Sequence, residues 1–211
     1  MVSPADQAVG ISARSDGGNN ALFLKKRFAL TLTDKSPQMI AVSKSINPEC
    51  EHVIGDMRGL RLGRRFDAVF VHDAICYMTT LADLRRALRT AFVHCKPGGV
   101  ALFAPDEYRD TFRRSTRHGG HDAATRGLRY LEVSSDPDPS DTQYDAEYVC
   151  LLRDGKLRRV VYDRHVLGLF SRDDWRKAIE RAGFQMLQMT RPSGCSNVIV
   201  VRRPGRRHAR V

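Results

Sequence analysis

Four short apolar segments in the first half of the chain constrain its fold more than any other feature. Each segment ends in polar or turn-forming residues, and an aspartate stands at or just beyond each end. The segments are residues 28–33 before Asp34, 51–55 before Asp56, 66–72 before Asp73, and 100–104 before Pro105 and Asp106. Segments with helical spacing separate the first from the second and the third from the fourth. Strands that alternate with helices need crossover connections, which predicts an α/β fold with a mostly parallel sheet.

The four aspartates are predicted to lie on one rim of that sheet. The carboxyl ends of parallel strands meet at the same edge, and ligands of open α/β sheets bind in the crevice beyond that edge. The sequence therefore predicts a polar ligand site lined by several carboxyl groups.

The remaining elements follow from local signals. Ser36 and Ser171 are expected N-caps, with Pro37 in the first helical position and Gly183 as a C-cap. The Asp154-Gly155 pair predicts a β-hairpin. The expected ranges are helices at 80–94 and 171–182, a turn at 96–99, a mobile loop at 107–127, a strand at 128–133, and two last strands at 184–190 and 197–203. The antiparallel block around the hairpin interrupts the alternation, so we interpret it as an insertion that covers the crevice.

The composition is that of one ordinary globular domain. The chain has 211 residues, of which 42% are hydrophobic and 28% charged. No apolar run could span a bilayer, and the N-terminus does not have the pattern of a signal peptide. We expect a single cytoplasmic domain over residues 1–211, with an atypical N-terminus at 1–15, a loop plus β insertion at 107–168 and a basic tail at 204–211. Because no segment could span a bilayer, no membrane partner is expected. The five scattered cysteines have no CxxC spacing, so no cysteine-based metal site is expected.

The net charge of +11 raises the question of nucleic acid. Part of the excess lies in the terminal stretch 202–210, and the basic runs contain no interleaved aromatic side chains on which bases could stack. This pattern favours a solvated basic surface over a nucleic-acid footprint.

Several motifs, in this order and spacing, resemble those of class I S-adenosylmethionine-dependent methyltransferases over about residues 16–204. The matching stretches are 32–39, 55–58, 66–69, 96–100, 169–170 and 182–184. Residues 105–112 and 165–170 further resemble amino-sugar N-methyltransferases, which act on small molecules. The resemblance implies a Rossmann-like, mostly parallel sheet with an antiparallel β insertion and a C-terminal antiparallel strand. It implies S-adenosylmethionine as cofactor and a small-molecule acceptor, with an amine as the leading choice.

The resemblance also assigns roles to individual residues. Asp34 would bind the ribose hydroxyls, although it could simply cap the following helix. Asp56 would accept from the adenine amine beside Met57, although it could simply end its strand in a turn. The remaining cofactor candidates are Gly17 and Gly18 in the glycine loop, Met39 on the ribose and adenine, and Asp73 with Ala74 near the methionine end. Met39 could instead be an ordinary core residue, and Asp73 a helix cap.

An amine acceptor must lose a proton, which requires a base or water. His165 is the leading base candidate and Tyr77 the second catalytic candidate. The other histidines considered are His118 and His121, and Tyr130 and Tyr144 could wall the acceptor pocket with Tyr77. Structural roles remain an alternative for all of these residues.

One motif departs from the family pattern. The first strand of the family ends in an acidic residue and a glycine-rich loop, whereas residues 12–18 retain only Gly17 and Gly18 and carry Arg14 at a glycine position. We therefore expect weak cofactor binding, and a degenerate homologue that acts as a binding protein stays an alternative function. RNA methylation is a second alternative, but residues 73–76 lack the motif of nucleobase-amine methyltransferases. A homodimer is an alternative to a monomer.

Overall fold

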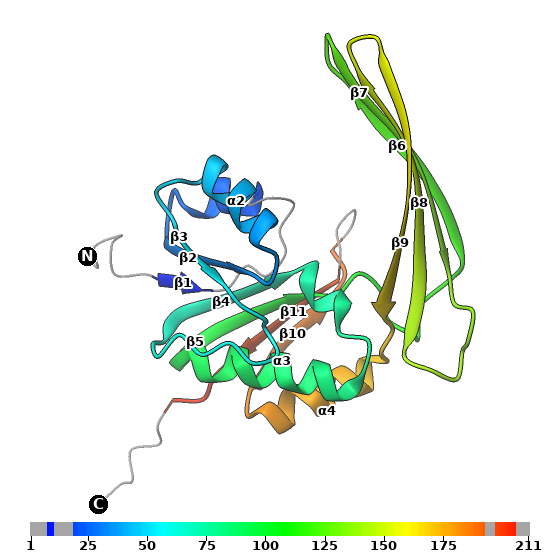
Figure 1. Cartoon of the computed structure of the whole chain (residues 1–211). Coiled ribbons are helices and arrows are strands. Elements are labelled where there is room, and N and C mark those ends of the chain that lie inside the picture. The colour runs from blue at the N-terminus through cyan, green and yellow to red at the C-terminus, as the bar shows by residue number, and fades with distance from the viewer. Residues whose placement is uncertain (1–7, 11–18, 193–196, 206–211) are drawn as a thin grey trace, which may run out of the picture.

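The computed structural model describes residues 8–10, 19–192 and 197–205, which form two β-sheets with helices around the larger one (Figure 1). The strands are β1 (Ala8–Gly10), β2 (Ala29–Asp34), β3 (Glu51–Ile54), β4 (Phe66–His72), β5 (Cys95–Ala104), β6 (Ser115–Asp122), β7 (Arg126–Ser135), β8 (Gln143–Asp154), β9 (Leu157–Gly168), β10 (Gln185–Thr190) and β11 (Val198–Arg202). The helices are α1 (Asn19–Leu24), α2 (Pro37–Ile46), the 3-10 turn η2 (Ala74–Tyr77), α3 (Leu81–His94) and α4 (Arg172–Ala182).

The larger sheet has the strand order β10-β11-β5-β4-β1-β2-β3. Strands β3, β2, β1, β4 and β5 pair in parallel, whereas β11 is antiparallel to both of its neighbours, β5 and β10. The predicted fold class, a mostly parallel sheet with a C-terminal antiparallel strand, is confirmed.

Strand β1 is short but central. It pairs with β2 on one side and β4 on the other, where the sequence predicted at most a short, weak strand. The motif that follows it, including Arg14, Gly17 and Gly18, lies outside the described residues.

The helices begin and end where the capping signals predicted. The side chains of Ser36, Thr80 and Ser171 accept from the N3 backbone amides of α2, α3 and α4, and Gly183 ends α4 in the left-handed region. In Figure 1, α3 and α4 pack along one face of the sheet, while α1 and α2 lie beside β2 and β3. The main core lies between α3, α4 and the sheet, where Phe103, Trp175 and Ile179 are almost completely buried.

Strands β6 to β9 form a four-stranded antiparallel sheet, here called the arm. The Asp154-Gly155 hairpin joins β8 to β9 as predicted, with Gly155 at φ 58°. Two local predictions were wrong. Residues 115–122 form a strand rather than a mobile loop, and residues 96–99 belong to β5, where the register shifts between Phe66 and Ala68 of β4 and Gly98 adopts φ 82°.

The base of the arm is attached at the predicted rim of the core sheet. The Thr142 hydroxyl donates to the Thr79 carbonyl at 2.6 Å, and β9 contacts η2, which follows the carboxyl end of β4. From this base the arm projects outward, as Figure 1 shows, so most of it does not lie across the core sheet as a cover. None of the helices in the described part of the chain is both long and apolar enough to cross a membrane.

Candidate cofactor and acceptor site

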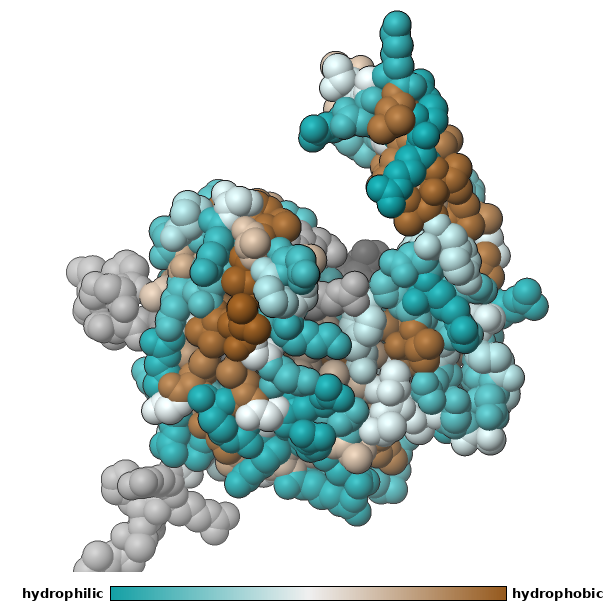
Figure 2. Space-filling view, in the orientation of Figure 1, coloured by the Kyte–Doolittle hydropathy of each residue, from teal (hydrophilic) through white to brown (hydrophobic). Residues whose placement is uncertain are grey.

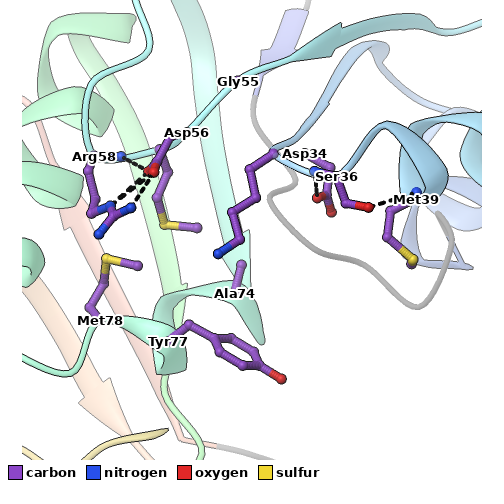
Figure 3. A pocket seen from close by; sticks show the side chains of 11 residues that line it. Asp34, Ser36, Met39, Gly55, Asp56, Arg58, Ala74, Tyr77 and Met78 are labelled. Atoms are coloured by element: carbon purple, nitrogen blue, oxygen red, sulfur yellow. Dashed lines mark hydrogen bonds and ion pairs between the residues drawn. The ribbon is translucent and has the colours of Figure 1, made fainter. Parts of the chain in front are cut away.

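A cavity of about 450 Å³ opens beyond the carboxyl ends of β2 and β3, next to η2 (Figure 3). This is the crevice that the strand order and the aspartates predicted. Its lining residues are Asp34, Lys35, Ser36, Met39, Gly55, Asp56, Met57, Arg58, Ala74, Tyr77 and Met78.

Asp34 is the last residue of β2 and is only 7% exposed. Its Oδ1 accepts the backbone N–H of Ser36 at 2.8 Å, and the Ser36 hydroxyl in turn accepts from the backbone of Met39. Asp34 therefore stabilises the start of α2, and it also lines the cavity. The two roles considered from the sequence are compatible, because a carboxylate has about four acceptor positions.

Asp56 lies across the cavity from Asp34 and is held by Arg58. The Arg58 guanidinium donates to both carboxylate oxygens of Asp56, with its shortest contact at 2.6 Å, and it also reaches Asp83 on α3 at 3.2 Å. The hydrogen bonds from Arg58 lower the pKa of Asp56. Asp56 is thus a fixed, charged acceptor on the cavity wall.

The other walls of the cavity are largely apolar. Met39, Met57 and Met78 line it together with Ala74, and Figure 3 shows Tyr77 on η2 beside Ala74. Thioether side chains adapt to flat aromatic groups. Sequence reasoning missed Lys35, Ser36, Arg58 and Met78; the position of Arg58 two residues after Asp56 was the available signal.

Tyr77 and His165 meet, although 88 positions separate them in the sequence. The Tyr77 hydroxyl lies 2.8 Å from Nδ1 of His165, and Nε2 of His165 lies 3.2 Å from a carboxylate oxygen of Asp163. The ring of Tyr148 packs edge-on against His165 at 5.4 Å. Asp163 was not predicted, but an Asp-x-His pair on a strand puts both side chains on one face.

The remaining candidates lie elsewhere. Asp73 is absent from the cavity lining; its carboxylate contacts Nδ1 of His72 at 2.7 Å, and its backbone has φ 48°. Residues His118 and His121 are exposed on the edge strand β6, away from Tyr77. Tyr130 lies on β7 opposite Gly119, and Tyr144 is buried at the base of the arm.

The geometry suits an adenosyl compound. The buried carboxylate of Asp34 and the ion-paired carboxylate of Asp56 can accept hydrogen bonds from hydroxyl or amine groups. The methionines offer a surface for a flat ring, and the volume is within the range of small-molecule sites. Residues 16–99 match a family model described as a methyltransferase domain. Over this region the chain is similar in sequence to S-adenosylmethionine-dependent methyltransferases of class I, and its sheet has the strand arrangement of their fold.

This chain matches two curated relatives that are named as sugar N,N-dimethyltransferases. It is 30% identical over 147 residues to a dTDP-4-amino-2,3,4,6-tetradeoxy-D-glucose N,N-dimethyltransferase of Saccharopolyspora spinosa, covering 65% of the chain and 55% of the relative. It is 29% identical over 155 residues to a dTDP-3-amino-3,6-dideoxy-alpha-D-glucopyranose N,N-dimethyltransferase of Streptomyces fradiae, covering 72% and 59%. The matches thus span less than two thirds of each relative's length.

Solved structures show the same fold. SAM-bound CalS10, an amino pentose methyltransferase from Micromonospora echinaspora, superposes with a TM-score of 0.84 at 22% identity, covering 95% of this chain and 84% of CalS10. Streptomyces venezuelae DesVI gives 0.85 at 24% identity, with 94% and 84% covered.

Proposed function

We propose that this protein transfers a methyl group from S-adenosylmethionine to the amine nitrogen of a small-molecule acceptor, an amino sugar carried on a nucleotide. The observation that carries the proposal is the hydrogen-bonded chain of Tyr77, His165 and Asp163, which begins on the wall of the cavity suited to the cofactor. Two relatives named as dTDP-amino-sugar N,N-dimethyltransferases support the choice of acceptor.

The cavity residues would hold the cofactor by complementary contacts. Asp34 would accept hydrogen bonds from the ribose hydroxyls and Asp56 from the adenine amine, with Met39 and Met57 against the flat and apolar parts. When bound, S-adenosylmethionine supplies an electrophilic methyl group on a sulfonium, whose departure as a neutral thioether needs no acid. The protein is left with three tasks, which are proximity, orientation and removal of the amine proton.

The Tyr77 chain fits the task of proton removal. If Nε2–H of His165 donates to Asp163, Nδ1 bears a lone pair and accepts the Tyr77 O–H. Tyr77 can then take a proton from the acceptor amine while its own proton passes to Nδ1. The imidazolium that results is stabilised by the Asp163 carboxylate, which is largely exposed and gives the proton a route to water.

The direct test combines the purified chain, S-adenosylmethionine and dTDP-3-amino-3,6-dideoxyglucose, with methylated products followed by mass spectrometry. We expect one and then two methyl groups on the amine. Cofactor binding without product would favour the binding-protein alternative, and salt-sensitive binding and methylation of RNA would favour the RNA alternative.

The variant Asp163→Asn tests whether Tyr77, His165 and Asp163 act together in removing the amine proton. Complete loss of general-base assistance lowers a rate by about 10²–10⁴-fold. Asp163→Asn weakens the base without removing it, so the decrease in rate should be smaller than this. We expect a lower kcat with little change in KM, and an altered pH profile of kcat. The matched control is Asp173→Asn, an exposed aspartate on α4 paired with Lys177. An unchanged profile in Asp163→Asn would remove Asp163 from the mechanism.

A further inference from the structure

The loop 55–65, which joins β3 to β4 and is here called the β3–β4 loop, is fastened to α3. Its first residues, 55–58, line the cavity. Three of its residues donate hydrogen bonds to α3, and the pairs are Arg58 with Asp83 at 3.2 Å, Arg61 with the Thr90 hydroxyl at 3.0 Å, and the Leu62 N–H with Nε2 of His94 at 2.9 Å. The spacing of positions 83, 90 and 94 puts the three acceptors on one face of the helix. One face of α3 therefore sets the position of this cavity wall.

His94 makes the one of these three contacts that depends on a neutral histidine ring. Its side chain is 2% exposed, and both of its ring nitrogens are hydrogen-bonded. Nδ1 lies 2.8 Å from the Thr90 carbonyl, which can only accept, while the Leu62 N–H can only donate. The proton of the neutral ring is therefore on Nδ1, and Nε2 presents its lone pair to the loop. His94 thus holds the loop only in its neutral form.

The surroundings of His94 disfavour a charged ring. Arg61 of the loop acts on it as a like charge. On the β4 side its neighbour is the Phe66 ring, with centroids 6.4 Å apart, and the Arg64 guanidinium above that ring is paired with Glu51. Burial lowers the pKa of His94 from 6.5; the hydrogen bond to the helix carbonyl opposes this shift, and the charge of Arg61 adds to it. A proton on Nε2 would also face the loop amide, so protonation breaks this contact.

A short path of contacts leads from Leu62 to the cavity. Close to Leu62 in the loop, the backbone N–H of Leu60 donates to the Asp56 carbonyl at 2.8 Å. The Leu60 side chain packs so closely on Gly55 that a Cβ there would lie 2.6 Å from the Leu60 Cδ1. Gly55 and Asp56 both line the cavity. Release of the loop at Leu62 can therefore shift the wall that carries the Asp56 carboxylate.

We propose that His94 is a positioning residue of the cofactor site, whose neutral ring holds the β3–β4 loop in its binding conformation and whose protonation releases the loop and weakens cofactor binding. This role rests on the cavity being the cofactor site, which is part of the proposed function, and it adds a control of that site by pH. Because the pKa of His94 is lowered, the contact is intact above pH 6.5 and is lost as the pH falls through the lower value of the folded protein. The pKa of Asp56 is lowered from 3.8, so its carboxylate keeps its charge while His94 titrates.

The test measures the affinity of the full chain for S-adenosylhomocysteine by isothermal titration between about pH 8 and about pH 5, the range in which histidine titrates. We expect the parent to bind about tenfold more weakly at the acidic end, because a buried hydrogen bond is lost. His94→Gln keeps an acceptor for the Leu62 N–H and cannot be protonated, so its affinity should stay constant. His94→Leu removes the acceptor and should bind weakly at every pH. The control His121→Gln, at an exposed position on β6, should follow the parent.

A measurement on the parent alone covers the case in which the His94 variants do not fold. NMR over the same pH range should show the Nδ1–H tautomer of His94 at high pH, and hydrogen-exchange protection of the Leu62 amide that falls as His94 titrates. A parent affinity that is constant, an equal fall in parent and His94→Gln, or Leu62 protection that ignores the titration would each overturn the proposal. Absence of methyl transfer to the dTDP-amino sugar, with the pH-dependent binding intact, would count against the proposed acceptor but not against His94.

Discussion

At the residue scale, Asp34 combines a structural contact with a ligand-facing position. Asp34→Ala should weaken S-adenosylhomocysteine binding about tenfold or more, because a hydrogen bond lost by a buried group costs about 1–3 kcal/mol. Isothermal titration measures the change. Ser36→Ala is the matched control, since it removes the N-cap of α2 and leaves the Asp34 carboxylate. Equal losses in both variants would mean that Asp34 acts only through the helix.

The Asp56–Arg58 pair predicts a dependence of stability on pH. The pair lowers the folded-state pKa of Asp56 from 3.8, so its stabilising contribution is present above pH 3.8 and is lost as the pH falls through the lower folded-state value. The stability difference between the parent and Asp56→Asn, measured by urea unfolding, should therefore shrink below pH 3.8. In an Arg58→Gln background the same comparison should lose most of this pH dependence; an unchanged dependence would contradict the pairing.

At the scale of elements, the sequence predicted the features that depend on neighbouring residues. These features are caps such as Ser171 and Gly183, the helix at 81–94 and the Asp154-Gly155 hairpin. Strand β6 could not be found in this way, because residues 115–122 have no apolar alternation and their strand conformation depends on pairing with the distant strand β7. The contact of Tyr77 with His165 was likewise hidden, since it depends on how the arm joins the core sheet.

Glycines explain how so polar a segment forms strand β6. A Cβ at Gly120 would lie 2.2 Å from the Leu128 carbonyl oxygen, and one at Gly119 would lie 2.9 Å from the Tyr130 ring. Gly120→Ala should therefore detach β6 locally, with a destabilisation of about 1–3 kcal/mol, as for other forced overpacking. Hydrogen exchange of the β6 and β7 amides reports it. Gly59→Ala is the control, because its Cβ would meet nothing within 4 Å; equal exchange in both variants would refute the close approach.

At the scale of the whole molecule, the arm has a group of apolar side chains that are exposed to solvent. Figure 2 shows apolar residues gathered along it. Val149 and Leu151 of β8 lie opposite Tyr162 and Val160 of β9, so all four share one face, and each is at least 44% exposed. Contiguous apolar patches of this kind mark interaction surfaces.

A second copy of the chain is the partner that we expect there. The same face carries Glu147 and Arg164 in one row, so a two-fold related arm can meet it with opposite charges as well as apolar side chains. Analytical ultracentrifugation should show a dimer, and Val160→Glu should shift it to monomer, because burying an unpaired charge is costly. Leu187→Glu, a similar change at an exposed position on β10, should leave the dimer intact. A parent chain that stays monomeric at all concentrations, or a dimer untouched by Val160→Glu, would leave the arm without this role.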